Sequence, residues 1–358
     1  MKNKIVELIA ANVEGLTAAE IADLIEIPPK PELGDFAFPC FRLAKTMRKA
    51  PQMIANDIKE AIGDVDFLQE IQVQGAYLNF FVKKELFIET MVTASMADDF
   101  GSSTEGNGQT ICIDYSSPNV AKNFHVGHLR TTIIGNSLYK IYSKLGYKVV
   151  RINHLGDWGT QFGKLIVAYK AWGSEEAVKK DGVAELMKLY VKFHEEAEKN
   201  PELNDEARAW FAKMEHGDEE ALKIWQWFKD ISLIEYKRTY DLLGMDFDYY
   251  LGESFYRDKT DDVVKRLTDA NLLTESEGAK IVNLDAYDMA PCLILKNDGS
   301  SIYATRDIAA IFYRKETYNF VKCLYVTGQE QKLHFKQVFK VVELLGNEWA
   351  CLLYTSDA

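Results

Sequence analysis

The segment from residue 110 to residue 153 limits the possible folds more than any other part of the sequence. The apolar-rich stretch TICIDYSS is followed by the loop PNVAKNFHVGH, a helix-forming stretch and a second apolar stretch, YKVVRINH. Strand, loop, helix and strand over so few residues predict a βαβ unit, and therefore a parallel sheet with a right-handed crossover. The predicted helix has an apolar stripe at helical spacing and a glycine suited to its C-cap: Leu129, Ile133, Ile134, Leu138, Ile141 and Leu145, then Gly146.

Residues 1–105 are expected to form a separate, small α/β domain. A chain of 358 residues exceeds the usual size of one hydrophobic core. IVELIA and AAEIADLIE have helical spacing, PPKPELGDFAFP is a loop punctuated by proline and glycine, and residues 42–63 predict one amphipathic helix. IQVQGAYLNFFV alternates like a strand with a glycine interruption, and FGSSTEGNGQ has the composition of a linker.

Residues 106–358 are expected to form the larger domain. Within it, residues 164–245 are charged, aromatic and helical in pattern, which predicts a helical insertion. Strand-like segments return at AKIVNLDA, CLILKN and VKCLYVTG, and the last precedes a helical pattern. We therefore expect an α/β fold in which a Rossmann-like parallel sheet resumes after the insertion.

The motif His125-Val126-Gly127-His128 lies between the first predicted strand and its helix. A helix N-terminus in a parallel α/β sheet favours anions, because free amides and the helix dipole both point at the ligand. Two imidazoles there can donate to the phosphates of ATP and stabilise charge that builds on the α-phosphate. Gly127 lets the nucleotide approach the backbone, and Lys122 adds a cation. The alternative, a chance pair of surface histidines, is weaker because three of the six histidines, including His154, surround this unit.

Composition restricts the remaining possibilities. No stretch approaches the roughly 18 apolar residues that a membrane-spanning helix needs, so we expect a soluble, cytoplasmic protein. The five cysteines are scattered and lack zinc-ligand spacing, which predicts reduced thiols and no metal site. The net charge of −12 disfavours nucleic acid, but residues 30–59 hold six basic and three acidic residues. That local excess of +3 suits either RNA or an ordinary solvated helix face.

Several motifs together resemble the arginyl-tRNA synthetases, a class I aminoacyl-tRNA synthetase family. HVGH resembles the class signature, and DYSSPNVAKNFHVGHLRTTIIG resembles its arginyl version. NHLGDWGTQFG, YATRDIAA and VTGQEQKLHFKQ extend the match, and GDFAFP and GAYLNF resemble the family's N-terminal domain. The resemblance covers nearly the whole chain up to Trp349, and it implies the class I synthetase form of the Rossmann-like fold.

The resemblance implies roles for individual residues. Lys122, His125 and His128 match the family's catalytic residues, which bind ATP. Gly127 is assigned to the ATP-binding residues by its place in the motif. The matches to the family's arginine pocket are Asp114, Asn119, Tyr303, Asp307 and Gln331. Such a set suits a guanidinium, which is planar, always charged and rich in donors, and so needs carboxylates in fixed positions. An isolated Asp at a helix start, such as Asp307, is by itself more often an N-cap than a ligand.

The remaining motifs have weaker assignments. Tyr77 and Asn79 match residues that contact the tRNA D-loop in bacterial relatives, although an aromatic in an alternating strand is ordinarily buried. Residues 156–163, GDWGTQFG, mark the family strongly without an evident chemical role, and Trp158 is expected at most to wall the nucleotide pocket. His334 has helical spacing in an amphipathic segment and is expected on a helix surface or in the core.

We therefore predict an arginine–tRNA ligase. It would use ATP, as its Mg²⁺ complex and without a tightly bound cofactor, to form arginyl-adenylate, and would then transfer arginine to tRNA(Arg). The resemblance also implies that tRNA must bind before arginine is activated, and we expect a monomer. CLLYTSDA departs from the family pattern, so we expect a truncated member without the KMSKS-like loop and the anticodon-binding domain. The alternatives are a non-catalytic tRNA-binding fragment and another HxGH nucleotidyltransferase.

Overall fold

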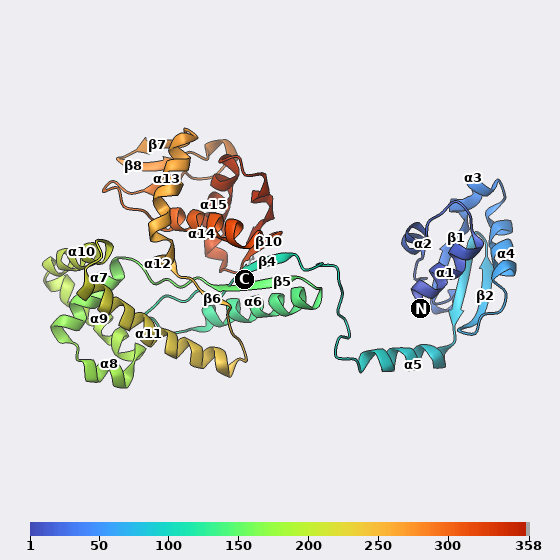
Figure 1. The fold of residues 1–358 in the computed structure, drawn as a ribbon, viewed down its shortest axis with the longest axis horizontal. Helices are drawn as coiled ribbons and strands as arrows, with labels where there is room; N and C mark the ends of the chain where they lie inside the picture. The colour runs from blue at the N-terminus through green and yellow to red at the C-terminus, as the bar shows by residue number, and fades with distance from the viewer. Residues whose placement is uncertain (356–358) are drawn as a thin grey trace. The chain divides into compact units, whose positions relative to one another are not determined.

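The computed structural model describes residues 1–355 and contains two compact units (Figure 1). The first comprises Met1–Gly101, and the second begins at Ser102. None of the helices in the described part of the chain combines the length and the apolar character needed to cross a membrane.

The first unit is a three-stranded antiparallel sheet on which helices pack. Its strand order is β1 (Phe36–Pro39), β3 (Tyr77–Val82) and β2 (Leu68–Gln74). Its helices are α1 (Lys2–Asn12), α2 (Ala18–Leu24), α3 (Ala44–Met47), α4 (Pro51–Ile62) and α5 (Lys84–Ser95), with 3₁₀ turns η1 (Pro31–Leu33) and η2 (Cys40–Leu43). Apolar side chains from α1, α2 and α4 meet those of the strands in one core, including Ile5, Ile9, Ile21, Phe38, Ile54, Ile58, Leu78 and Phe80.

Local turn chemistry corrects three predictions in this unit. The single helix expected over residues 42–63 is broken, because Arg48 adopts a left-handed conformation (φ 51°) and Pro51 starts α4 at its first position. The interrupted strand is a hairpin of β2 and β3 that turns at Gly75 (φ 60°). The expected loop PPKPELGDFAFP ends in β1, whose residues pair with β3.

The second unit contains the predicted parallel sheet, with strand order β11-β10-β4-β5-β6. All four strand pairs are parallel. Helix α6 (Val126–Lys144) connects the first two strands in the chain, as the βαβ pattern predicts. The strands are β4 (Thr110–Asp114), β5 (Lys148–Asn153), β6 (Tyr249–Tyr250), β10 (Lys322–Tyr325) and β11 (Leu353–Thr355).

Helices make up most of the rest of this unit. The predicted insertion consists of five helices, seen in green to yellow in Figure 1: α7 (Thr160–Trp172), α8 (Glu175–Asp181), α9 (Val183–Lys199), α10 (Glu202–Glu215) and α11 (Glu219–Leu242). The later helices are α12 (Glu253–Tyr256), α13 (Thr260–Asp269), α14 (Tyr303–Tyr318) and α15 (Lys332–Leu344), with 3₁₀ turns η3 (Arg257–Lys259), η4 (Asp285–Tyr287), η5 (Gln329–Gln331) and η6 (Glu348–Leu352).

Two of the three later strand segments do not rejoin the parallel sheet. β8 (Ala279–Val282) and β9 (Cys292–Leu295) form a separate antiparallel sheet with β7 (Leu273–Ser276). Only VKCLYVTG, as β10, resumes the parallel sheet. Apolar alternation could not separate these cases, because it indicates a half-buried strand without naming its partner. The C-terminal tail contributes a further strand, β11, which pairs in parallel with β10.

The faces of β4 explain how the unit is held together. Ile111 and Ile113 pack in a core with the insertion helices, whereas Cys112 between them belongs to a second core with α14 and α15. Successive strand residues point to opposite faces, so one buried strand supports both cores. The helix α6 is less apolar at its buried positions than predicted: these are Thr132, Gly135 and Asn136, while Ile133 and Ile141 are exposed.

Candidate active site

Several predicted site residues follow the carboxyl ends of β4 and β10: Asn119, Lys122, His125 and His128 come after β4, and Gln331 comes after β10. The chain continues from β4 towards β5 on one side, whereas β10 lies on the other side, so the strand order reverses between these two strands. Such a reversal opens a crevice at the carboxyl ends of parallel strands, where ligands bind. Asp114 ends β4, faces Tyr325 in the register, and its carbonyl accepts a hydrogen bond from Val326 N at 2.8 Å.

The loop after β4 is held in an unusual conformation. Ser116, Ser117 and Ala121 all have positive φ, at 74°, 46° and 60°. Side chains that are not glycine adopt this conformation at a cost, and the surrounding structure must maintain it. The loop therefore depends on contacts outside its own sequence.

Helix α11 supplies those contacts from three buried residues, each four positions after the one before. Ser232 Oγ accepts a hydrogen bond from Ala121 N at 3.0 Å. Tyr236 Oη lies 2.5 Å from the Asn119 carbonyl and 2.7 Å from the Lys122 carbonyl, to which it donates. Tyr240 Oη lies 2.7 Å from Ser116 Oγ. The insertion thus braces the loop that carries the candidate phosphate-binding residues, a role that the sequence analysis missed although the i, i+4 spacing was visible.

His125 and His128 lie together at the N-terminus of α6. His125 is the N-cap, and its Nδ1 accepts from Gly127 N at 3.2 Å, while His128 Nδ1 accepts from His125 N at 3.3 Å. The ring centroids are 3.8 Å apart. Because each Nδ1 accepts a hydrogen bond, the neutral ring carries its proton on Nε2. Both rings therefore have a donor available for a ligand.

The charge state of His128 follows from its surroundings. Burial, together with smaller contributions from the neighbouring His125 and Lys122, lowers the pKa of His128 to about 4. A neutral imidazole with its proton on Nε2 still donates a hydrogen bond at pH 7. Lys122 is exposed and supplies the permanent cation on this loop.

Gly127 also leaves room for the His125 ring. A Cβ at this position would lie 3.0 Å from His125 Cε1 and 3.1 Å from His125 Nδ1. A larger residue would press on the His125 ring, which adds a local reason to the predicted one.

Asp114 does not present a free carboxylate. Its Oδ2 lies 2.8 Å from Arg314 Nη2, and its Oδ1 accepts from Ser117 Oγ at 2.9 Å. The Arg314 side chain is 0% exposed and that of Asp114 is 9% exposed. The charge of Asp114 is thus already neutralised from within the chain.

Asp307 lies in the second turn of α14, not at its N-cap, which is Ile302. Its Oδ2 accepts from His334 Nε2 of α15 at 2.6 Å, and its Oδ1 lies 3.8 Å from His154 Nε2 after β5. Burial raises the pKa of Asp307, but the hydrogen bond from His334 and the neighbouring His154 outweigh it and lower the pKa overall. His334, expected only on a helix surface or in a core, is therefore a partner of a predicted site residue.

The other predicted pocket residues have separate surroundings. Tyr303, 57% exposed, starts α14, and Arg306 of the next turn lies over its ring at 5.1 Å. Asn119 is exposed and forms a backbone bridge with Gly156. Gln331 is exposed at the start of α15.

Arg306 is also paired with a buried acid. Arg306 Nη2 lies 3.1 Å from Glu253 Oε2 of α12. Burial raises the pKa of Glu253 to about 8, and the Arg306 charge opposes that rise. Sequence reasoning missed both residues because they are far apart in the chain.

The GDWG segment has a structural explanation that the sequence did not give. Asp157 is fully buried, accepts from Ser254 N and Ser254 Oγ at 2.8 Å each, and lies 2.6 Å from Lys229 Nζ of α11. A Cβ at Gly252 would lie 2.4 Å from the Asp157 carboxylate, so only glycine fits there. Asp157 therefore joins the loop after β5 to the insertion and to the start of α12.

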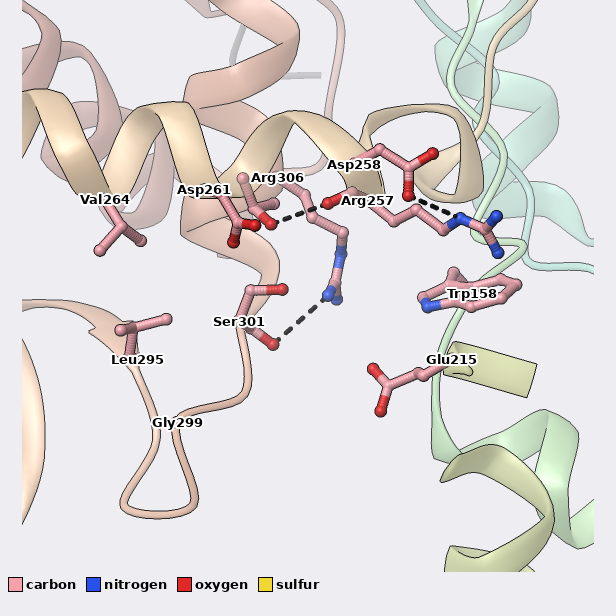
Figure 2. A pocket seen from close by; sticks show the side chains of 11 residues that line it. Trp158, Glu215, Arg257, Asp258, Asp261, Val264, Leu295, Gly299, Ser301 and Arg306 are labelled. Atoms are coloured by element: carbon pink, nitrogen blue, oxygen red, sulfur yellow. Dashed lines mark hydrogen bonds and ion pairs between the residues drawn. The ribbon is translucent and has the colours of Figure 1, made fainter. Parts of the chain in front are cut away.

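Trp158 borders a polar cavity of about 230 Å³, shown in Figure 2. The Arg306 side chain extends into the cavity, and Glu215 of α10 faces it. The Trp158 ring lies beneath the Arg257 guanidinium at 5.0 Å. None of the predicted site residues lines this cavity, so it is distinct from the histidine pair and from the Asp114 and Asp307 carboxylates.

Tyr77 and Asn79 lie on β3 in the first unit, two positions apart and on one face. Tyr77 is partly exposed and contacts the Phe41 ring edge-on at 5.9 Å. Asn79 is only 4% exposed, in the central strand. The tyrosine is thus accessible to a base, whereas the amide is covered by its neighbours.

Family models account for most of both units. The model for the catalytic domain of class I (R) tRNA synthetases matches residues 91–351, and the model for the arginyl tRNA synthetase N terminal domain matches residues 3–82. The chain belongs to the arginyl-tRNA synthetase family. The predicted family and class I fold are thereby confirmed.

Curated members of this family are similar over almost the entire chain. The arginine–tRNA ligases of Alkaliphilus metalliredigens and Clostridium perfringens are each 57% identical over 351 residues. The match covers 98% of this chain and 62% of each relative. The chain therefore spans about three fifths of the length of these ligases.

Solved arginyl-tRNA synthetases have the same fold. The Plasmodium falciparum enzyme matches with a TM-score of 0.66 at 24% identity, over 99% of this chain and 63% of that one. The Thermus thermophilus enzyme also has a TM-score of 0.66, at 21% identity, over 99% and 65% of the two chains.

Proposed function

We propose that this chain carries the catalytic site of an arginine–tRNA ligase. The observation that supports this most strongly is the paired Nε2 donors of His125 and His128 at a helix N-terminus, together with one acid at the end of β4 and another in the second turn of α14. Such an arrangement suits ATP phosphates on one side and a cationic amino acid on the other.

The proposed reaction has two steps. The arginine carboxylate attacks the α-phosphorus of ATP, forming a carboxyl–phosphate bond as the bond to pyrophosphate breaks. The 2′-hydroxyl of the terminal adenosine then takes the arginyl group and AMP leaves. His125, His128 and Lys122 stabilise the charge on the phosphate oxygens, and the braced loop holds them in place.

The acids and amides divide the recognition of arginine. The Asp307 carboxylate, kept ionised by its lowered pKa, faces the substrate cation, and Tyr303 stacks beside it or bonds it. Asn119 and Gln331, both exposed at the same edge of the sheet, bind the α-amino end. Asp114, already paired with Arg314, borders the proposed pocket.

Magnesium enters with ATP in this proposal. Among residues 1–355, no three His, Cys, Asp or Glu side chains are grouped so that they could hold a metal ion. Mg²⁺ on nucleotides keeps several waters and takes few protein ligands, so the phosphates would supply most of its coordination. We further propose that the enzyme works in the cytoplasm as a monomer.

Arginine-dependent exchange of pyrophosphate into ATP tests the proposal in the full-length protein. We expect exchange with arginine and tRNA together, and none with lysine in place of arginine. Exchange without tRNA would contradict the proposed order of binding. The absence of arginine-dependent exchange under every condition would contradict the ligase itself.

The first unit is proposed to bind tRNA through Tyr77. Base stacking on an aromatic ring contributes about 1–3 kcal/mol, so Tyr77→Ala is expected to weaken tRNA binding roughly tenfold in a filter-binding assay. Tyr77→Phe retains the ring and should bind normally. Equal losses in both variants would indicate that the hydroxyl, not stacking, is important.

A further inference from the structure

Arg314 is the largest fully buried side chain of the described residues and has no role in the predicted site. It lies in α14 seven positions after Asp307, so the two residues share a face of the helix two turns apart. The intervening sequence, IAAIFY, is apolar. A permanently charged guanidinium in such surroundings is costly unless a specific partner compensates it.

The partner is Asp114. Arg314 Nη2 lies 2.8 Å from Asp114 Oδ2, and the guanidinium carbon lies 5.1 Å from the centre of the Tyr325 ring in the neighbouring strand. The same Nη2 lies 3.5 Å from His154 Nδ1, and His154 Nε2 lies 3.8 Å from Asp307 Oδ1. One guanidinium thus fixes the carboxylate at the end of β4 and reaches, through one imidazole, the carboxylate of α14.

We propose that Arg314 is a positioning residue, whose guanidinium neutralises Asp114 so that recognition of the substrate guanidinium falls on Asp307. The two acids differ in their partners. Asp114 has a full positive charge 2.8 Å away and a 9% exposed side chain, whereas the side chain of Asp307 is 17% exposed and lies beside the imidazoles of His334 and His154. A second guanidinium is therefore attracted more strongly to Asp307. This inference rests on the proposed function and assigns a role to each acid in it.

A double-mutant cycle on unfolding tests the pair without relying on activity. Asp114→Asn leaves a buried cation and Arg314→Met leaves a buried acid, so each should lower the Tm by on the order of 10 °C. The double variant removes both charges and should recover most of that loss. Additive losses would overturn the proposed pairing.

The ratio of the dissociation constants of citrulline and arginine tests the division of roles. Citrulline has a neutral ureido group in place of the guanidinium, so the ratio measures recognition of charge. Calorimetric titration should give a ratio in the Asp114→Asn/Arg314→Met variant within about threefold of wild type, since Asp307 remains. Asp307→Asn should reduce the ratio at least tenfold, because hydrogen bonds to charged groups are the stronger ones. An equal reduction of the ratio in Asp114→Asn/Arg314→Met and in Asp307→Asn would overturn the proposal.

A matched pair on the same sheet serves as control. Arg151 of β5 and Asp248 form a bidentate pair, with 2.7 Å between Nη2 and Oδ1. Asp248→Asn/Arg151→Met should leave the ratio unchanged. If the wild-type protein binds neither ligand, the proposed function fails, whereas the unfolding cycle still decides whether Asp114 and Arg314 are coupled.

Discussion

The histidine pair and the carboxylate cluster lie at the same sheet edge but are built in opposite ways. His125 and His128 come from one stretch of four residues and cap their own helix, with His125 exposed and His128 half-buried. The cluster of Asp114, His154, Asp307, Arg314 and His334 comes from the ends of β4 and β5 and from two helices, and its contacts join residues up to 200 positions apart in the chain. The first can be read from a motif, while the second exists only after folding.

This difference predicts different consequences of substitution. A change in the histidine pair should affect chemistry with little effect on stability, because few other residues depend on these rings. A change in the buried network should affect stability and binding together, because each charge there compensates another.

The largest expected effect is that of His128→Ala on adenylate formation. Loss of one donor to a developing anion reduces kcat by about 10²- to 10³-fold. Single-turnover formation of arginyl-adenylate would measure it, with Val126→Ala as control because Val126 is 80% exposed beside the pair. A comparable loss of Tm would contradict the view that the pair is locally built.

Asp157→Asn should mainly reduce stability. It leaves Lys229, whose side chain is 16% exposed, without its counter-ion, and we expect the Tm to fall by on the order of 5 °C. Asp230→Asn, on the exposed surface of the same insertion helix, is the matched control and should change the Tm little. Equal Tm values for Asp157→Asn and wild type would show that this connection is not needed for folding.

Tyr236→Phe should have a smaller effect that links the two regions. The variant keeps the ring in the core but removes the hydroxyl that donates to the Asn119 and Lys122 carbonyls. A neutral hydrogen bond contributes about 1 kcal/mol, so the KM for ATP should rise roughly fivefold with a Tm close to wild type. Tyr249→Phe, at a side chain that is 43% exposed, should leave the KM unchanged. An unaltered KM for ATP in Tyr236→Phe would show that this hydroxyl of the insertion does not help the loop to bind ATP.

The smallest effect concerns pH. The pKa of His128 is lowered from 6.5 to about 4, so the unfolded chain binds more protons between these values. The stability that neutral His128 contributes to the folded chain is therefore intact above pH 6.5 and is lost as the pH falls towards 4. Melting curves at pH 7 and pH 4.5 should show a smaller loss for His128→Ala than for wild type. If the Tm falls equally in wild type and in His128→Ala, residues other than His128 cause the loss of stability in acid.

The sequence by itself determined the parts of the protein that depend on neighbours in the chain. The βαβ unit, the helical insertion and the HVGH motif followed from periodicity and from residues close together, because helix capping and strand alternation are local. The motifs also predicted the family, which the comparisons confirmed. The prediction of a single helix over residues 42–63 was wrong, because Arg48 adopts a left-handed conformation and Pro51 starts a new helix.

Only the tertiary structure decided which strands pair and which charges meet. Apolar alternation in β8 and β9 was read correctly as strand, but hydrogen bonds placed them in a separate sheet. The predicted pocket residue Asp114 was found already paired with Arg314, and Asp307 was found held by His154 and His334. An ion pair depends on distance in space and on burial, and neither can be read from residue type or spacing until the sheet and the helices that cover it are in place.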